Sequence, residues 1–440
     1  MRRLACSTIL LVLGTSGSCS HDSTSPPAPS APSRAAEAQS TGHARYTVVD
    51  LGTLGGASSG ASTINNKGWV AGFSNLPNNQ SQHAFLWRSG EITDLGTLGG
   101  PNSVVFAALA KSNRGDIAGQ AETSAPDPLH ENFCSFAGPP GFNGGLTCLG
   151  FLWRDGVMTA LPTLGGNNAQ AYGVNDRGQV VGVAETAVHD PTCVAPQVLD
   201  YEAVIWGPKA GELHELPPLP GDRVAVAVAI NEQGQVVGAS LSCGPVDPGR
   251  SAHAVLWEHG SVTNLGSLGG ALDNVPLAIN NRGQVVGFSH LAGDVIEHAF
   301  FWGNGTMTDL GPLPGDIQSF ASAIDEQGDV IGTSCDVNFN CRAVMWQHGV
   351  VVDLNTLIAS GSTLSLIGGA DINDRGEIAG QGFDPRTGDT PAFLAIPNSA
   401  EDAAGLTAER VQSTARTETT LPENVRRALR QRLRHGRLGW

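Results

Sequence analysis

A short turn signal recurs seven times along the chain, and it restricts the fold more than any other pattern. The copies are INNKG (64–68), SNRG (112–115), VNDRG (174–178), INEQG (230–234), INNRG (279–283), IDEQG (324–328) and INDRG (372–376). Their closing glycines lie 45 to 63 residues apart, a period typical of propeller blades and related arrays. Asn or Asp hydrogen-bonds its own backbone in such a turn, and Gly takes the left-handed conformation. Each copy therefore predicts a hairpin of two strands.

Two further strands follow each hairpin, and we call the four strands of a repeat a, b, c and d in chain order. Strand c carries an aromatic signature: HAFLW (83–87), GFLW (150–153), EAVIW (202–206), HAVLW (253–257), HAFFW (298–302), RAVMW (342–346) and PAFLA (391–395). Strand d runs through segments such as ITDLG (92–96). Four strands per repeat predict an all-β, seven-bladed β-propeller of four-stranded blades over residues 45–397. A linear solenoid is the alternative, but it would need capping repeats, and none is visible.

The two ends of the repeat array complement each other. The seventh repeat ends at residues 393–397 without a strand d, and an unassigned strand of that type, YTVVDLG, stands at residues 46–52. We therefore expect the N-terminal strand to complete the last blade. Such pairing would leave no open sheet edge.

The side chains of strand c predict contacts between and within blades. The six tryptophans that end this strand (Trp87, Trp153, Trp206, Trp257, Trp302 and Trp346) are expected to pack blade against blade. Three histidines begin strand c, each 11 residues before an acid or amide, which predicts the cross-strand pairs His83 with Asp94, His253 with Asn264 and His298 with Asp309. Arg342 and Asp353 repeat the spacing.

The HAF-x-W strand and the LGTLGG step (51–56 and 95–100) resemble those of the HAF-repeat family of bacterial extracellular proteins. The resemblance extends over all seven repeats, although the second lacks the His-Ala-Phe start and the seventh lacks the Trp. It implies an exported protein with β-propeller-like repeats. It implies no particular activity.

The N-terminus predicts export. Residues 1–19 have a basic start, an apolar run of about a dozen residues and small residues before Cys19. The segment resembles a bacterial lipoprotein signal, in which Cys19 would be lipidated, although Ser16 stands where Leu is usual. Cleavage by an ordinary signal peptidase is the alternative. Residues 20–44 are rich in Ser, Pro and Ala and predict a flexible linker. We expect an outer-membrane or cell-surface lipoprotein, or else a secreted or periplasmic protein.

Residues 398–440 follow the predicted propeller and form a mostly polar tail. Leu421, Val425, Leu429 and Leu433 recur every four residues among arginines. This spacing predicts a short basic amphipathic segment that could lie on an anionic membrane or on the acidic propeller. A tail without fixed structure is the alternative.

Charge and motifs exclude several classes of partner. The net charge is −16 and the chain has only three lysines, which disfavours nucleic acid because phosphate binding needs a basic face. The glycine-rich steps after strand d lead into another strand, whereas a phosphate loop leads into a helix. No HExxH or EF-hand pattern occurs. We expect no cofactor, no metal and a monomeric protein.

Departures from the repeat indicate where function lies. Three long b-to-c insertions, at 121–149, 185–201 and 240–252, belong to neighbouring repeats and should rise on one face of the ring. All six cysteines outside the signal lie in b-to-c loops. The economical pairing is Cys134 with Cys148, Cys193 with Cys243 and Cys335 with Cys341, among 15 possible connectivities.

These insertions carry aromatic and polar side chains suited to a ligand. The candidate ligand-binding residues are His130, Glu131, Phe133, Phe136, Asn143, His189, Asp190, Tyr201 and Arg250, with Lys111 and Asp371 on inner strands. We predict a non-catalytic binding or scaffold protein for a glycan, peptide or protein. A secreted glycan hydrolase or lyase is the alternative, with His130, Glu131, Asp190 and Tyr201 as its candidate cluster. A disulfide-pinned loop without a ligand is the third interpretation.

Overall fold

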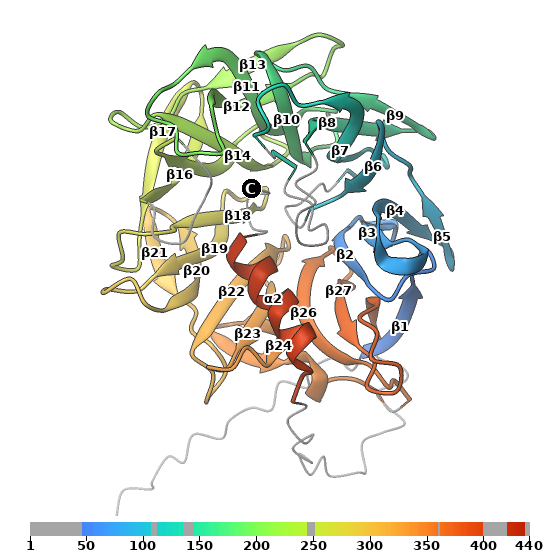
Figure 1. Cartoon of the computed structure of the whole chain (residues 1–440). Helices are drawn as coiled ribbons and strands as arrows, with labels where there is room; N and C mark the ends of the chain where they lie inside the picture. The colour runs from blue at the N-terminus through green and yellow to red at the C-terminus, as the bar shows by residue number, and fades with distance from the viewer. Residues whose placement is uncertain are drawn as a thin grey trace, which may run out of the picture. The chain divides into compact units, whose positions relative to one another are not determined.

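The structure is a computed structural model, and it describes residues 46–106, 112–131, 133–134, 145–243, 251–359, 361–398 and 420–435. The chain divides into two units, Met1–His43 and Ala44–Trp440, and every described residue belongs to the second. Twenty-eight strands form seven four-stranded antiparallel sheets, arranged as the blades of a β-propeller (Figure 1). This confirms the predicted fold class. Within the described ranges, no helix has the length and apolarity needed to cross a membrane.

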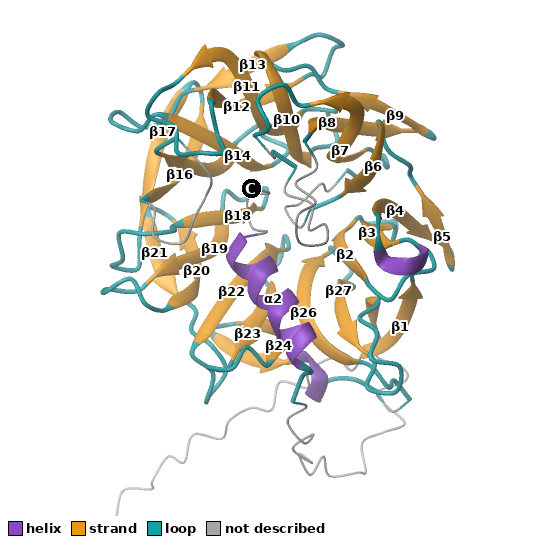
Figure 2. Cartoon of the chain, viewed as in Figure 1, coloured by secondary structure: helices purple, strands orange, loops and turns teal. Residues whose placement is uncertain are grey.

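The blades follow one another along the chain, and strands account for nearly all of the regular structure (Figure 2). Blade one is β2 (Ser59–Ile64), β3 (Val70–Asn75), β4 (Gln82–Arg88) and β5 (Glu91–Asp94); blade two is β6 (Gly99–Val104), β7 (Ile117–Pro126), β8 (Leu146–Arg154) and β9 (Val157–Ala160); blade three is β10 (Gly165–Val174), β11 (Val180–His189), β12 (Leu199–Trp206) and β13 (Leu213–Leu216); blade four is β14 (Val224–Ile230), β15 (Val236–Leu241), β16 (Ala252–Glu258) and β17 (Ser261–Gly266). Blade five is β18 (Val275–Ile279), β19 (Val285–His290), β20 (Glu297–Gly303) and β21 (Thr306–Asp309); blade six is β22 (Gln318–Ile324), β23 (Val330–Cys335), β24 (Cys341–Gln347) and β25 (Val350–Asp353). Two short 3-10 helices, η1 (Pro77–Asn79) and η2 (Leu354–Thr356), lie in connections.

Blade seven contains both ends of the repeat array. Its strands are β26 (Ser365–Ile372), β27 (Ile378–Phe383), β28 (Ala392–Pro397) and β1 (Tyr46–Gly52), in that order across the sheet. β1 pairs antiparallel with β28, from Tyr46 opposite Pro397 to Gly52 opposite Ala392. Tyr46 also donates its N–H to Leu357 and accepts from Ala359, which extends the contact to the end of blade six.

The inner strands are lined with small residues because neighbouring backbones approach one another closely. All seven residues of β14 (VAVAVAI) are buried. A Cβ atom built on Gly238 of the adjacent strand would lie 1.9 Å from the carbonyl oxygen of Val226, so only glycine fits there. Glycine at this position thus permits the close approach of adjacent strands within the blade.

The strand c tryptophans join consecutive blades, as the sequence predicts. The indole N–H of Trp206 in blade three donates to the carbonyl of Pro162, just after blade two, at 2.8 Å. Trp257 and Trp346 make the equivalent bonds to Pro217 and Gly311 at 2.7 and 2.9 Å. Each of these side chains therefore adds a directed hydrogen bond to its packing area.

The turn asparagines have a second role that the repeat pattern does not reveal. In six of the seven a-to-b turns the first Asn or Asp accepts from backbone N–H groups of its own turn, as Asn280 does from Arg282 and Gln284, and in blade two Ser112 takes this position. The Nδ2 of the turn Asn also donates to the turn of the next blade: Asn175 to Asn231, Asn231 to Asn280 and Asn280 to Asp325, at 3.0 to 3.1 Å. Asn373 of blade seven donates to Asn65 of blade one at 3.0 Å. These bonds run from blade to blade along one face.

Blade six interrupts this series and supplies a test. Asp325 occupies the turn position, accepts from three backbone N–H groups and lacks an amide donor. Burial raises the pKa of this carboxyl. Asp325→Asn should keep the acceptor, remove a buried charge and add the missing donor toward blade seven, which raises the free energy of unfolding by about 1 kcal/mol. Asn280→Asp is the matched reverse change and should lower it by a similar amount in urea denaturation. A change of the same sign in the two variants would contradict the role of the turn amide as a donor to the next blade.

Candidate functional site

The b-to-c loops of blades two and three extend the propeller on one face. β7 and β11 run for ten residues each, compared with six for β15 and β19. The longer strands carry the predicted insertions outward. We call the surface formed by the b-to-c loops and the d-to-a loops the insert face.

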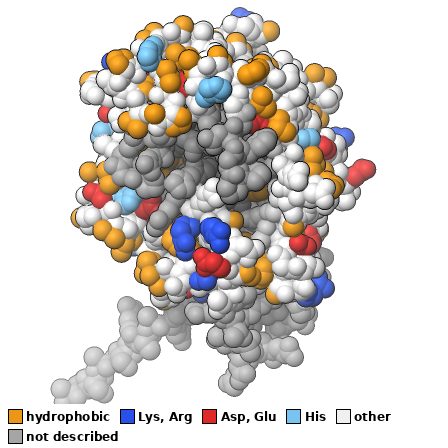
Figure 3. Space-filling model, in the orientation of Figure 1, with side chains coloured by type: hydrophobic (Ala, Val, Ile, Leu, Met, Phe, Trp, Pro, Cys, Tyr) orange, Lys and Arg blue, Asp and Glu red, His pale blue; other side chains and the backbone are white. Residues whose placement is uncertain are grey.

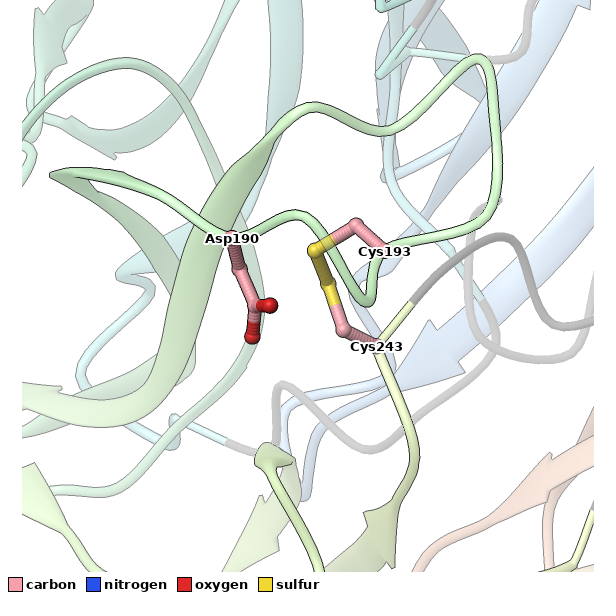
Figure 4. Close-up of side chains that lie close together, drawn as sticks. All are labelled: Asp190, Cys193 and Cys243. Carbon is pink, nitrogen blue, oxygen red and sulfur yellow. A yellow bond between two sulfur atoms is a disulfide. The ribbon is translucent and has the colours of Figure 1, made fainter.

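Three disulfides pin loops of the insert face. They join Cys134 with Cys148, Cys193 with Cys243 and Cys335 with Cys341, which confirms the expected pairing. The second bridges blades three and four across 50 residues of sequence (Figure 4). The disulfides indicate an oxidising, exported environment.

Asp190 lies beside this inter-blade disulfide and stabilises its loop (Figure 4). Its Oδ1 accepts from the N–H and hydroxyl of Thr192, both at 2.7 Å, and its Oδ2 accepts from Arg223 at 2.6 Å. The Thr192 hydroxyl and the Arg223 guanidinium lower the pKa of Asp190 to about 2. Because both cysteines are oxidised, no thiolate is present here to form a metal site with Asp190.

Glu131 is buried and organises the loop of the neighbouring blade. It is 2% exposed, and its Oε1 accepts from the N–H groups of Val198 and Leu199 at 2.9 and 2.7 Å. The Gln197 amide donates both to Glu131 and to Glu185, at 3.2 and 2.9 Å. Oε2 of Glu131 has no hydrogen-bond partner among the described residues. Burial first, and then the charge of Glu131, raise the pKa of Glu185 to about 8.

This carboxyl pair predicts a pH dependence of stability. The folded chain holds a proton on Glu185 up to about pH 8, whereas the unfolded chain releases it near 4.5. Folding therefore binds protons in this window, so this group's contribution to stability falls as the pH rises from about 4.5 to 8. Glu131→Gln keeps the Oε1 acceptor and removes the like charge, so the loss of stability between pH 4.5 and 8 should be smaller in this variant. Melting temperatures at pH 5, 7 and 9 measure the loss. Parallel plots of melting temperature against pH for the variant and the parent would contradict the coupling between the two carboxyl groups.

The aromatic candidates on these loops form a supporting core. Phe133 and Tyr201 are 1% and 0% exposed, and their rings meet edge to face with centroids 6.3 Å apart. They lie in one apolar cluster with two of the disulfide cysteines, Cys134 and Cys148. Neither ring is available to stack on a ligand in this arrangement.

The other candidate residues lie in different settings. His130 and His189 are exposed on the loops of blades two and three. Asp371 is fully buried and accepts from the Thr63 hydroxyl and the Ile64 N–H at 3.0 and 2.9 Å, so it joins blade seven to blade one. Phe136, Asn143, Arg250 and Lys111 lie outside the described residues.

The structure does not bring the nominated catalytic cluster together at a surface. Glu131 and Asp190 are buried and bonded within the loops, Tyr201 is in the core, and only His130 is exposed. A general acid must reach the atom that it protonates. Glu131, Asp190 and Tyr201 therefore have structural roles within the loops.

Most of the exposed aliphatic side chains of the described residues lie on the insert face, spread over several blades, and the sequence did not indicate this. The described residues include eight exposed large hydrophobic side chains. Six of them lie at the insert-face end of a blade: Leu129, Val194, Val295, Ile317 and Val337 on b-to-c or d-to-a connections, and Val188 near the end of β11. The other two, Val157 and Val350, lie on c-to-d hairpins at the opposite face. Apolar atoms of this kind (orange) are spread round the ring in Figure 3.

The C-terminal helix packs on the insert face. α2 (Glu423–His435) follows Leu421, whose N–H donates to Asn340 in the b-to-c loop of blade six at 3.0 Å. Leu421, Val425 and Leu429 are buried in the same apolar cluster as Phe339. The apolar side chains at the predicted spacing therefore face the propeller. Basic side chains (blue) gather over the helix in Figure 3.

The cross-strand histidine pairs form in two of the three predicted cases. His83 and His298 contact Asp94 and Asp309, each with Nδ1 2.9 Å from a carboxylate oxygen. The prediction for His253 was wrong: its Nδ1 lies 2.9 Å from Asp222, which precedes β14. A neutral amide at position 264 competes poorly with that carboxylate.

Known proteins offer little guidance to this arrangement. No protein-family model matches the chain, and no curated protein matches it. A puromycin-hydrolyzing peptidase of Mycobacterium tuberculosis is similar over 79% of this chain and 56% of its own length, with 12% identity and a TM-score of 0.46. A gluconolactonase of Xanthomonas campestris is similar over 57% of this chain and 82% of its own, with 13% identity and a TM-score of 0.32. An Aleuria aurantia lectin is similar over 72% of this chain and 98% of its own length, with 10% identity and a TM-score of 0.35.

Proposed function

We propose that this protein is an exported, non-catalytic propeller that binds a protein or peptide partner through its insert face. The observation that carries the proposal is the placement on that face of six of the eight exposed large aliphatic side chains among the described residues. An excess of exposed apolar side chains on one face over the opposite face favours the first as an interaction surface.

The chemistry of these side chains favours a polypeptide over a glycan. The exposed groups are Leu, Val and Ile, and no described Trp, Tyr or Phe is exposed. Sugar rings usually stack on accessible aromatic faces, whereas aliphatic side chains pack against apolar side chains of a partner. A protein or peptide ligand therefore suits this surface better.

The scaffold beneath the loops favours a pre-ordered binding surface. Disulfides, the Glu131 contacts to Val198 and Leu199, and the Asp190–Arg223 pair hold the loops in place. Ordered loops lose less conformational entropy on binding than free ones. Export and tethering through a lipid on Cys19, as in the HAF-repeat family that the chain resembles, would place this surface outside the cell.

Arrays of peptides and of glycans test the proposal. The mature chain from residue 20 to 440 is labelled and applied to both arrays, and any ligand that it retains is analysed for products after incubation. We expect retention on peptides with apolar side chains and no conversion of the ligand. Retention on glycans alone, or turnover of a retained ligand, would contradict the proposal and favour the glycan hydrolase or lyase.

A further inference from the structure

Blade five holds a cluster of ligand-type side chains that the binding surface does not use. Asp273 precedes β18, His290 ends β19 and Glu297 begins β20, so all three lie at the insert-face end of the blade. They are 8%, 8% and 9% exposed. One metal-ligating atom from each residue lies within 4.8 Å of those of the other two.

The imidazole of His290 is oriented by the backbone. Its Nδ1 lies 3.1 Å from the carbonyl oxygen of Leu272, and because a carbonyl only accepts, Nδ1 carries the proton. Nε2 then presents its lone pair toward Glu297, 4.0 Å from Oε1. This nitrogen has no hydrogen bond to any described residue. A ring N–H bound to a carbonyl is the arrangement that orients metal-ligating histidines.

Other blades fill the same positions with a direct hydrogen bond. In blade two, Nδ2 of Asn102 donates to Oε2 of Glu122 at 2.7 Å, and blade three repeats this pair at 3.0 Å. In blade five, Asp273 replaces the amide and His290 replaces the acid. The change converts a self-satisfied amide–carboxylate pair into a set of two carboxylates and an imidazole.

The distances between the imidazole and the carboxylates of this cluster are also longer than those in the hydrogen-bonded His–Asp pairs of this chain. His83 and Asp94 are in contact at 2.9 Å, whereas Nε2 of His290 lies 4.0 Å from Oε1 of Glu297 and the ligand atoms of the three residues all lie within 4.8 Å of one another. Around a tetrahedral zinc ion, with bonds of about 2.1 Å, ligand atoms lie about 3.4 Å from one another. These groups therefore need to approach one another by about 0.6 to 1.4 Å to share one ion.

We propose that Asp273, His290 and Glu297 bind one divalent transition-metal ion, with zinc as the test ion. Two carboxylates balance its charge, and the imidazole favours a transition metal over calcium or magnesium. Three protein ligands leave a coordination position for water or for a group of a bound partner. The site would lie at the same face as the exposed aliphatic side chains.

Metal titration of the mature full chain tests this site. The protein is stripped with EDTA and titrated with Zn²⁺ by calorimetry and with Co²⁺ by visible absorption, which reports low-symmetry coordination. We expect one ion per chain, a higher melting temperature with Zn²⁺, and binding at least about tenfold weaker in His290→Gln and in Glu297→Gln. Melting curves without metal establish that both variants fold.

The neighbouring histidine is the matched control. His298 lies next to Glu297 and pairs directly with Asp309, and His298→Gln should bind zinc as the parent does. The proposal is overturned if the parent binds no ion stoichiometrically. It is equally overturned if both variants at positions 290 and 297 fold and keep the parent affinity, or if His298→Gln alone loses it.

Discussion

Deletion of residues 46–52 is expected to lower the melting temperature of the whole propeller on the order of 10 °C. The deletion removes β1 and with it six backbone-paired positions along β28. It also removes the side chains of Tyr46 and Leu51, which are 5% and 4% exposed. Two buried side chains and a row of strand hydrogen bonds together contribute about 5 kcal/mol or more.

The deletion should destabilise more than blade seven. Tyr46 bonds to Leu357 and Ala359 at the end of blade six, so its removal weakens a second blade. The exposed edge of β28 should also promote aggregation on heating. Calorimetry and light scattering measure the two effects. Deletion of seven linker residues, 30–36, is the length-matched control; if both deletions melt at the parent temperature, β1 does not close the ring.

Removal of the Cys193–Cys243 disulfide is the second change with a large expected effect. The bond closes a loop of 50 residues between neighbouring blades, and loop-closure entropy predicts a loss of about 4 kcal/mol for the double serine variant. The Cys335–Cys341 bond closes only six residues, and its removal should cost about 2 kcal/mol. Reducing agent should lower the melting temperature of the parent more than that of either variant.

The pair of double variants provides an internal comparison. Both remove one disulfide from a b-to-c loop of the same face, and they differ in loop length and in whether the bond joins blades. Urea denaturation under non-reducing conditions measures the difference. A larger loss for the Cys335 and Cys341 variant would contradict the account in which the longer bond holds two blades together.

Features that repeat were predictable because local chemistry determines them. Turn asparagines and strand c tryptophans recur at one position of the repeat, and the cysteines all fall in b-to-c loops, so their positions could be seen in the sequence. The blade-to-blade donation of Asn280 was not predictable, since it depends on how far apart consecutive blades lie. The partner of His253 was missed for a different reason: Asp222 lies 31 residues away in sequence and reaches it only in the folded blade.

The candidate site was harder to predict because composition does not determine exposure. Glu131 and Tyr201 occur in two insertions rich in polar and aromatic residues, yet both side chains are buried once the loops pack. Val194 is 52% exposed, and a lone valine in a loop gives no signal in the sequence. The apolar spacing of the tail suits a membrane and a propeller equally, and the packing of Val425 and Leu429 places it on the propeller.

The affinity of loop variants for a peptide selected by the array tests the proposed binding face most directly. Val188→Ser with Val194→Ser changes two exposed side chains of the insert face, and Val157→Ser with Val350→Ser changes two of similar exposure on the opposite face. We expect the first double variant to bind the peptide at least about tenfold more weakly, since two apolar contacts are lost, and the second to bind as the parent does. Unchanged affinity in the first variant, or an equal loss in the second, would contradict a binding site on the insert face.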